Sequence, residues 1–317
     1  MERPFAVLAL VALLAGCTGG AGADVARPGG PHRVEPFEIE VAGGSARGLV
    51  AIPEGTPTTL VVLAHPWSTG SELFRPDLER LAGTGVLGVA MDFRGEVDSF
   101  KVGAGVADTV AATLALQADH PSVDRTLLYG WSMGAEVAFL AVADAPAGTY
   151  DYVFDGAGVT DLAALWHSFY AARPFIEAET GGTPAEVPAE YARRSPVERV
   201  AELKDKGVAR YFIVHGAGDA PVPVEQAERM YSGLAEAGLP VSYYVVTTNE
   251  EPWLCTPVVT VCAPNPPKGL ANHEAGGPRL MRPFLDHRIE RLPDPAAAAV
   301  RGTYEGDTGT YEPSDVG

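Results

Sequence analysis

The sequence predicts an α/β fold: a doubly wound, mostly parallel sheet with a helical cap insertion. Three observations carry this prediction. Short runs rich in Val, Ile, Leu and aromatic residues alternate with helix-like segments, as in proteins built from strand–helix–strand units. Several of these runs are almost continuously apolar, which is typical of strands covered on both faces. The interval between 156 and 209, about fifty residues, is too long for a simple connection between strands.

The strands are expected in six runs, preceded by a hairpin. Residues 35–53 (EPFEIEVAGGSARGLVAIP) contain the turn signal GGS, which predicts an antiparallel hairpin at one edge of the sheet. The six runs are TTLVVLAHP (58–66), VLGVAMDF (86–93), RTLLYG (125–130), YDYVFDG (150–156), ARYFIVHG (209–216) and VSYYVV (241–246).

Helices are expected between these runs and in the long interval. The four segments between runs are SELFRPDLERLAG (71–83), GVADTVAATLALQAD (105–119), GAEVAFLAVAD (134–144) and VEQAERMYSGLAEAG (224–238). Residues 157–208 contain five large aromatics and the interruption GGTPAEVP. This composition predicts a helical excursion over one end of the sheet, although one helix and a long surface loop would also fit. A lid is favoured because long insertions in compact domains are usually functional or disordered.

The two ends of the chain are expected to lie outside the folded domain. Residues 5–15 form an apolar run about half the ~20 residues that a membrane helix needs, so 1–16 are predicted to be a signal peptide. The sequence LAGC, ending at Cys17, resembles the lipobox of bacterial lipoproteins and implies a lipid anchor to the cell membrane. An ordinary cleaved signal, with secretion, is the alternative. Residues 17–33 read as a tether and 293–317 as a disordered acidic tail, which leaves 34–292 as the domain.

Charge and cysteine content exclude some classes of partner. The net charge of −18 would repel phosphate-rich partners, so nucleic acid binding is disfavoured. Outside the cytoplasm, Cys255 and Cys262 are expected to form a disulfide that stabilises the chain by about 2–3 kcal/mol. Their C-x6-C spacing lacks the paired C-x2-C elements of a zinc site, and neither a metal nor a cofactor is expected.

Ser132 is the candidate nucleophile. It lies in GWSMG, between the expected strand RTLLYG and the expected helix AEVAFLAVAD. A sharp strand-to-helix turn pushes a serine hydroxyl above the sheet edge, and the small residues Gly130 and Gly134 relieve the crowding there. A serine needs a base that is itself oriented by an acid, and in this kind of fold they follow in the order Ser, Asp or Glu, His.

The acid and the base are sought after Ser132 in that order. Asp219 follows an expected buried strand on a Gly-rich turn and is the preferred acid; its alternative role is to cap the next helix. Asp155, one strand earlier, competes with it, whereas Asp161 is expected to cap a helix. The histidines after Asp219 are His273, in the loop GLANHEAGG, and His287, inside an amphipathic helix, and loop placement favours His273.

Two backbone amides are expected to form the oxyanion hole. One is that of Met133, directly after the nucleophile, and the other comes from the loop AHPWSTG. Pro66 has no N–H, so Trp67 is the preferred second donor and Ser68 the alternative. The histidines that end strands, His65 and His215, are expected to orient loops rather than to act as bases.

Taken together, these segments resemble the α/β-hydrolase superfamily, in its dienelactone-hydrolase-like and prolyl-oligopeptidase-like branch. HPWSTG is similar to the oxyanion loop of that family, DFRG (92–95) to its D-x-R-G turn, GWSMG to its elbow, HGAGDAPVP to its acid loop and NHE to its histidine loop. The resemblance covers residues 34–292. The chain departs from the family pattern at Ala135 and Pro66, where a glycine is common.

The primary functional expectation is an exported serine hydrolase that cleaves carboxylic esters. Ser132 would attack the ester carbonyl, His273 would relay the proton, and Asp219 would orient His273. The replacement of the family's oxyanion-loop glycine by Pro66 favours esters over peptide bonds as substrates. The alternatives are a serine exopeptidase acting on short peptides and a catalytically silent lipoprotein that binds a ligand under the cap.

Overall fold

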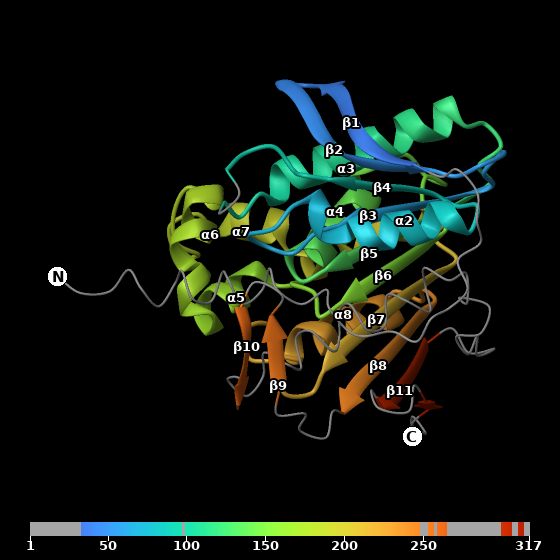
Figure 1. Ribbon diagram of the computed structural model, residues 1–317. Helices are drawn as coiled ribbons and strands as arrows, with labels where there is room; N and C mark the ends of the chain where they lie inside the picture. Colours follow the sequence, from blue (N-terminus) through green and yellow to red (C-terminus); the bar gives the residue numbers. More distant parts are fainter. Residues whose placement is uncertain are drawn as a thin grey trace.

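A computed structural model describes residues 33–96, 99–247, 253–256, 259–264, 299–305 and 310–313 of the chain. A ten-stranded sheet forms its centre, in the order β1-β2-β4-β3-β5-β6-β7-β8-β11-β12 (Figure 1). Its strands are β1 (Arg33–Val41), β2 (Gly44–Ile52), β3 (Thr59–Ala64), β4 (Leu87–Met91), β5 (Arg125–Trp131), β6 (Tyr152–Gly156), β7 (Arg210–Gly216), β8 (Val241–Thr247), β11 (Ala299–Glu305) and β12 (Thr310–Pro313). A separate antiparallel pair consists of β9 (Trp253–Thr256) and β10 (Val259–Pro264).

The mostly parallel character of the sheet is confirmed. Every pairing from β4 through β3, β5, β6, β7 and β8 to β11 is parallel. The predicted hairpin forms β1 and β2, which pair antiparallel, and β2 joins β4 antiparallel. Because parallel strands end at the same edge, the segments that follow β3, β5, β6 and β7 meet along one edge of the sheet.

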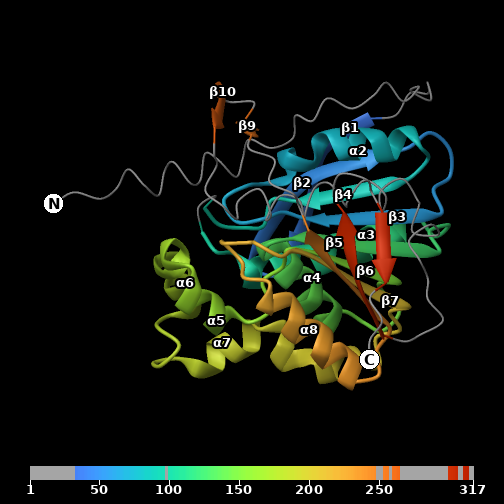
Figure 2. The same ribbon diagram turned by 90° about the horizontal axis from the view of Figure 1, so that it is seen from below.

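Helices cover both faces of the sheet, which confirms the doubly wound arrangement. On one face, α2 (Arg75–Gly83) packs Leu78 and Leu81 into the core that contains Tyr129 of β5. The opposite core contains Leu128 of β5 and is covered by α3 (Val102–Asp119), α4 (Met133–Asp144) and α8 (Glu225–Glu236). Figure 2 shows α2 on one side of the sheet and α4 and α8 on the other.

The interval between β6 and β7 forms the predicted helical insertion. It contains α5 (Leu162–Ser168), η2 (Tyr170–Ala172), α6 (Arg173–Thr180), α7 (Pro188–Arg194) and η3 (Pro196–Leu203). Asp161 caps α5 by accepting a hydrogen bond of 2.8 Å from the Ala164 N–H, as expected from the sequence. In Figure 1 these helices gather at one end of the sheet. Within the described residues, no helix is both long and apolar enough to cross a membrane.

The prediction of a disordered tail over 293–317 is wrong for two segments. Residues 299–305 form β11, which pairs in parallel with β8, and residues 310–313 form β12. Arg301 of β11 makes an ion pair of 2.9 Å with Glu228 and lies 5.4 Å from the ring centre of Tyr243. Apolar periodicity did not predict β11, because a strand near the edge of a sheet can be held by backbone hydrogen bonds and needs no apolar run.

Candidate active site

Ser132 lies in a strained turn between β5 and α4. Its backbone has φ 58° and ψ −123°, a conformation that residues with a side chain rarely adopt. The turn is tied to the segment after β6, because the Ser132 N–H donates to the Gly156 carbonyl at 2.9 Å and the Ser132 carbonyl accepts from the Val159 N–H at 3.3 Å. The side chain therefore stands where strand β5 ends and α4 begins, as the sequence pattern predicts.

The two glycines around Ser132 are required by close backbone contacts. A Cβ atom at Gly130 would lie 2.2 Å from the Gly134 carbonyl oxygen. A Cβ atom at Gly134 would lie 2.0 Å from the carbonyl oxygen of Ala64, at the end of β3. The next position tolerates a methyl group, since Ala135 is fully buried in α4. Only the two glycines of the G-x-S-x-G pattern are therefore needed for this turn to fit against β3.

The amide of Met133, the predicted oxyanion donor, lies at the start of α4. Met133 is the first residue of α4, and the amides of the first helical turn have no carbonyl partner within their own helix. They also lie at the positive end of the helix dipole, which favours developing negative charge near Ser132.

The loop that follows β3 brings Trp67 to the same edge of the sheet. The loop is fixed by the Pro66 carbonyl, which accepts from the Thr69 hydroxyl at 2.8 Å and lies 2.8 Å from Nδ1 of His65. Ser68 adopts a positive φ of 62°. His65 is buried, and burial lowers its pKa to about 4, so its imidazole is neutral. It orients the loop, as expected for a histidine at the end of a strand.

The indole of Trp67 contacts the helical insertion. It is 4 % exposed, and its ring centre lies 4.9 Å from that of Phe175 and 6.2 Å from that of Phe169. Phe100, before α3, lies 6.3 Å from it on another side. The insertion therefore packs directly on the loop that carries the candidate oxyanion donor, through an aromatic cluster.

The D-x-R-G turn, residues 92–95, packs against the loop that carries Trp67. An Asp92 carboxylate oxygen accepts from the Ser71 N–H at 2.8 Å, and Phe93 stacks on His65 at 4.1 Å between ring centres. Arg94 binds the fully buried Asp108 of α3 at 2.7 Å. These contacts join the end of β4 to α3 and to the oxyanion loop.

Asp219, the predicted acid, lies in the turn after β7. One carboxylate oxygen accepts from the Val222 N–H at 2.9 Å, and the other lies 3.4 Å from Nε2 of His215. Burial acts to lower the pKa of His215, but the hydrogen bond and the charge of Asp219 outweigh it, so that pKa is raised. The imidazole of His215, near the end of β7, thus faces Asp219 in the turn that follows this strand.

Asp155, the competing acid, is buried at the end of β6. It is 1 % exposed, and among the described residues neither of its carboxylate oxygens has a hydrogen-bond partner. Burial raises its pKa to about 7, while His215 and the Gly158 N–H act in the opposite direction. A triad acid must be directed at the base, and Asp219, in the turn after β7, is better placed for this than Asp155, which is enclosed at the end of β6.

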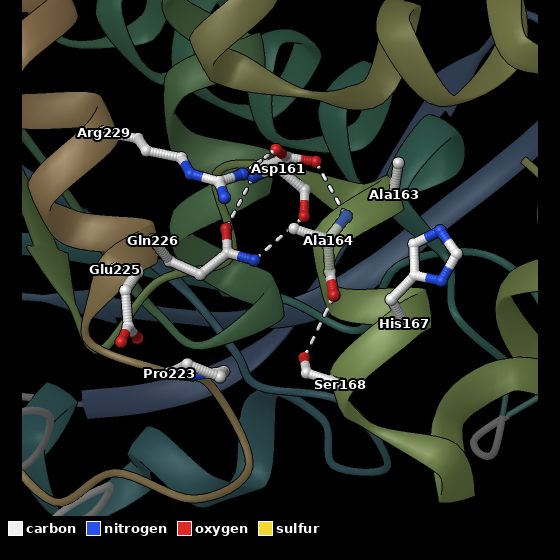
Figure 3. Close-up of a pocket in the computed structure, with 9 residues that line it drawn as sticks. All are labelled: Asp161, Ala163, Ala164, His167, Ser168, Pro223, Glu225, Gln226 and Arg229. Carbon is white, nitrogen blue, oxygen red and sulfur yellow. Dashed lines mark hydrogen bonds and ion pairs between the residues drawn. The ribbon is translucent and has the colours of Figure 1, made fainter.

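A cleft of about 620 Å³ opens between α5 and the start of α8 (Figure 3). It adjoins the acid loop through Pro223, and Asp161 crosses it to form an ion pair with Arg229. The side-chain amide of Gln226 ties the two walls by hydrogen bonds to the backbone of Thr160 and Asp161, at 2.9 Å and 2.6 Å. The cleft therefore has a rigid, polar floor next to the candidate site.

Several predicted site residues lie outside the described residues. These are His273, His287 and Cys17, together with the signal peptide and most of the tether. Cys255 and Cys262 belong to the paired strands β9 and β10, and their disulfide stays a prediction. Within the described part of the chain, no cluster of His, Cys, Asp and Glu could hold a metal ion.

Sequence reasoning missed a buried carboxyl group next to the elbow. Glu136 of α4 is fully buried, and both of its oxygens lack a hydrogen-bond partner among the described residues. Burial, aided by the charge of Glu179, raises its pKa well above the usual range, against the influence of Arg194. The signal was available, since Glu136 is a lone charge within the apolar segment GAEVAFLAVA.

Comparison with known proteins gives relatives that are peptidases by name. A Bacillus subtilis (strain 168) protein, described as the uncharacterized peptidase YtmA, is 28% identical over 143 residues, which are 44% of this chain and 53% of that protein. The chain thus spans about half the length of this curated relative.

Two solved structures share the fold at low sequence identity. The uncomplexed Pyrococcus horikoshii acylaminoacyl peptidase matches with a TM-score of 0.62 and 14% identity, over 84% of this chain and 43% of that one. Porphyromonas gingivalis dipeptidyl peptidase 4 matches with a TM-score of 0.54 and 20% identity, over 67% of this chain and 31% of that one.

A family model supplies the classification. The model of the prolyl oligopeptidase family, Peptidase S9, matches residues 81–259, a span that includes Ser132 and Asp219. Because this match covers more than half of the chain, the protein belongs to the prolyl oligopeptidase family, within the α/β-hydrolase superfamily.

Proposed function

We propose that this protein is a serine peptidase that acts on short peptides. The observation that carries the proposal is the strained turn at Ser132, held between Gly130 and Gly134 and facing the loop of Trp67. The family supports cleavage of amide bonds, and the named relatives are an acylaminoacyl peptidase, a dipeptidyl peptidase and a peptidase of unassigned specificity. The peptidase alternative is thus better supported than the ester hydrolysis preferred from the sequence.

The proposed mechanism passes through an acyl-enzyme. Ser132 Oγ attacks the carbonyl carbon of the substrate while His273 accepts the hydroxyl proton and Asp219 orients the imidazole. The amides of Met133 and Trp67 stabilise the oxyanion. The amine leaves with the proton from His273, and water then releases the acyl group by the same steps.

Substrate recognition is proposed to involve two described features. Phe169 and Phe175, the partly buried members of the aromatic cluster around Trp67, offer an apolar wall beside the oxyanion loop. The cleft between α5 and α8 has the exposed carboxylate of Glu225 in its lining, which suits the amino end of a short peptide. A substrate with an apolar side chain and a free amine matches both features.

Ester hydrolysis is the second candidate. Pro66 provides no N–H to the oxyanion loop, and an ester, whose leaving group departs more readily than an amine, depends less on that stabilisation. The same Ser132 would serve both reactions, so a panel that contains esters and amides separates them.

The test compares Ser132→Ala with Ser122→Ala, which removes a surface hydroxyl bonded to the Pro57 carbonyl. We expect wild type and Ser122→Ala to react stoichiometrically with a fluorophosphonate probe and to hydrolyse aminoacyl and dipeptidyl amides. Ser132→Ala should do neither while keeping its fold. Labelling that persists in Ser132→Ala would exclude this nucleophile. Folded wild type without labelling would favour a silent, ligand-binding protein.

We further propose that the protein is exported and anchored to the bacterial cell membrane through a lipid on Cys17. The apolar run of 5–15 followed by LAGC supports this proposal. Cys17→Ala should move the protein from the membrane fraction to the soluble fraction. An unchanged membrane fraction would rule out this anchor.

A further inference from the structure

A second imidazole, that of His215, lies fully buried inside the acid loop. Its Nε2 is 2.7 Å from the Val222 carbonyl oxygen and 3.4 Å from a carboxylate oxygen of Asp219. A carbonyl oxygen can only accept a hydrogen bond, so Nε2 must carry a proton. Val222 is then held twice, because its N–H donates to Asp219 and its carbonyl accepts from His215.

The other ring nitrogen of His215, Nδ1, lies in a different environment from Nε2. Nδ1 of His215 is buried and has no hydrogen-bond partner among the described residues, and the same holds for both oxygens of Asp155. Parallel pairing sets Asp155 opposite Ile213, two residues before His215, so Asp155 and His215 lie on the same face of the sheet, one diagonal step apart. The charge of each acts on the other.

We propose that Asp155 is a positioning residue that keeps His215 in its doubly protonated, cationic form, and through His215 holds the carboxylate of Asp219 in place. The imidazolium then interacts with two anionic groups: Asp219, 3.4 Å from Nε2, and Asp155, one diagonal step away on the same face of the sheet. A buried imidazole without such groups would be neutral. The inference rests on the proposed function only where it concerns catalysis.

Among the described residues, the other ionisable groups that interact with Asp155 do not supply an alternative charge. Tyr129 of β5 and Tyr243 of β8 are the other ionisable side chains on which Asp155 acts, and burial raises the pKa of both phenols, so they stay neutral. From the α4 side, a Cβ at Gly158 would touch Asp155 at 2.2 Å and Ala135 at 2.5 Å, so the carboxyl group is packed against the start of that helix. The helix α8 contributes the apolar side chains of Ala227 and Met230 to this core.

The first test measures the charge of His215 directly, without substrate. Nitrogen-15 chemical shifts of the ring in the full-length protein should show both nitrogens of His215 protonated at pH 7. In Asp155→Asn, the pKa of His215 should fall by about one unit or more, corresponding to at least a tenfold fall in the ratio of cationic to neutral imidazole at a given pH. A neutral His215 in wild type would overturn the proposal, and so would a His215 titration unchanged in Asp155→Asn.

The control for this measurement is Glu136→Gln, which also removes a buried carboxyl group without a hydrogen-bond partner. The charges that act on Glu136 are those of Glu179 and Arg194, so its substitution should leave the titration of His215 unchanged. An equal shift in both variants would mean that any buried carboxyl group produces the effect, and would sink the specific role of Asp155. If Asp155→Asn does not fold, the titration of His215 in the wild type still decides whether this imidazole is cationic.

The second test concerns turnover. With a peptide amide, kcat of Asp155→Asn should fall about tenfold at pH 7 with KM nearly unchanged, because orientation of the base matters in the transition state. In a His215→Gln background, where the loop keeps a neutral donor, the same substitution should have no further effect. Equal losses in both backgrounds would contradict the route through His215. A wild type without any turnover would count against the proposed function and leave the nitrogen-15 result to stand by itself.

Discussion

Ser132 stores backbone strain that a glycine would release. At φ 58° and ψ −123°, a residue with a Cβ atom costs of the order of 1–3 kcal/mol more than in a common conformation. Glycine adopts this region freely, but it loses about 0.5–1 kcal/mol more backbone entropy on folding. Ser132→Gly should therefore be more stable than Ser132→Ala by roughly 0.5–2 kcal/mol.

The comparison of Gly with Ala matters because both variants lose the hydroxyl. Urea unfolding followed by circular dichroism gives the difference in free energy of unfolding between the two. Ser242 provides the matched control, since it is fully buried inside strand β8 and does not have a positive φ. There the glycine variant should be less stable than the alanine variant by about 0.5–1 kcal/mol. If Ser132→Gly were no more stable than Ser132→Ala, the elbow would not be strained and our reasoning would be refuted.

Three further predictions follow from contacts described above. Gly134→Ala should lower the free energy of unfolding in urea by roughly 1–3 kcal/mol and turnover by up to about 10²-fold, because the new Cβ would lie 2.0 Å from a backbone oxygen of β3. Near-wild-type values of both would refute this close approach. Arg94→Ala should cost about 2–3 kcal/mol, because it removes the cation from the buried carboxylate of Asp108 and leaves only the backbone N–H of residue 94 as donor among the described residues. A loss below about 0.5 kcal/mol would contradict this. For Glu136, the raised pKa in the folded state means that wild-type stability falls as pH rises above the unfolded value of 4.5, by about 1.4 kcal/mol per pH unit. Glu136→Gln should thus match wild type near pH 4 and exceed it increasingly toward neutral pH, and a constant difference across that range would count against a protonated Glu136.

The sheet and the elbow could be predicted from the sequence because their signals are local. Continuous apolar runs marked β3 to β8, and the glycines on either side of Ser132 marked a turn that only small residues allow. Ser132 and Asp219 then fall at the same carboxyl edge of the sheet, after β5 and β7, the two parallel strands on either side of β6.

Contacts between distant segments could not be predicted in this way. The placement of Asp155 and His215 on one face of the sheet depends on the register between β6 and β7, and the burial of Glu136 depends on how the insertion packs on α4. Residues 299–305 resemble a polar tail when their sequence is considered alone. They form a strand because their backbone pairs with that of β8. The choice between ester and amide substrates also has no local signal, because it depends on the shape of the pocket rather than on the elbow.

The parallel pairing of β8 with β11 has a consequence for the segment between them. Residues 248–298, which include His273, leave the sheet at one strand and return to the strand beside it. Both ends of this segment are thereby held at adjacent strands, and a closed loop of chain costs less entropy when its ends are fixed close together. Under the proposed mechanism, loosening β11, far from Ser132 in the chain, should therefore slow turnover without altering any of the proposed catalytic residues.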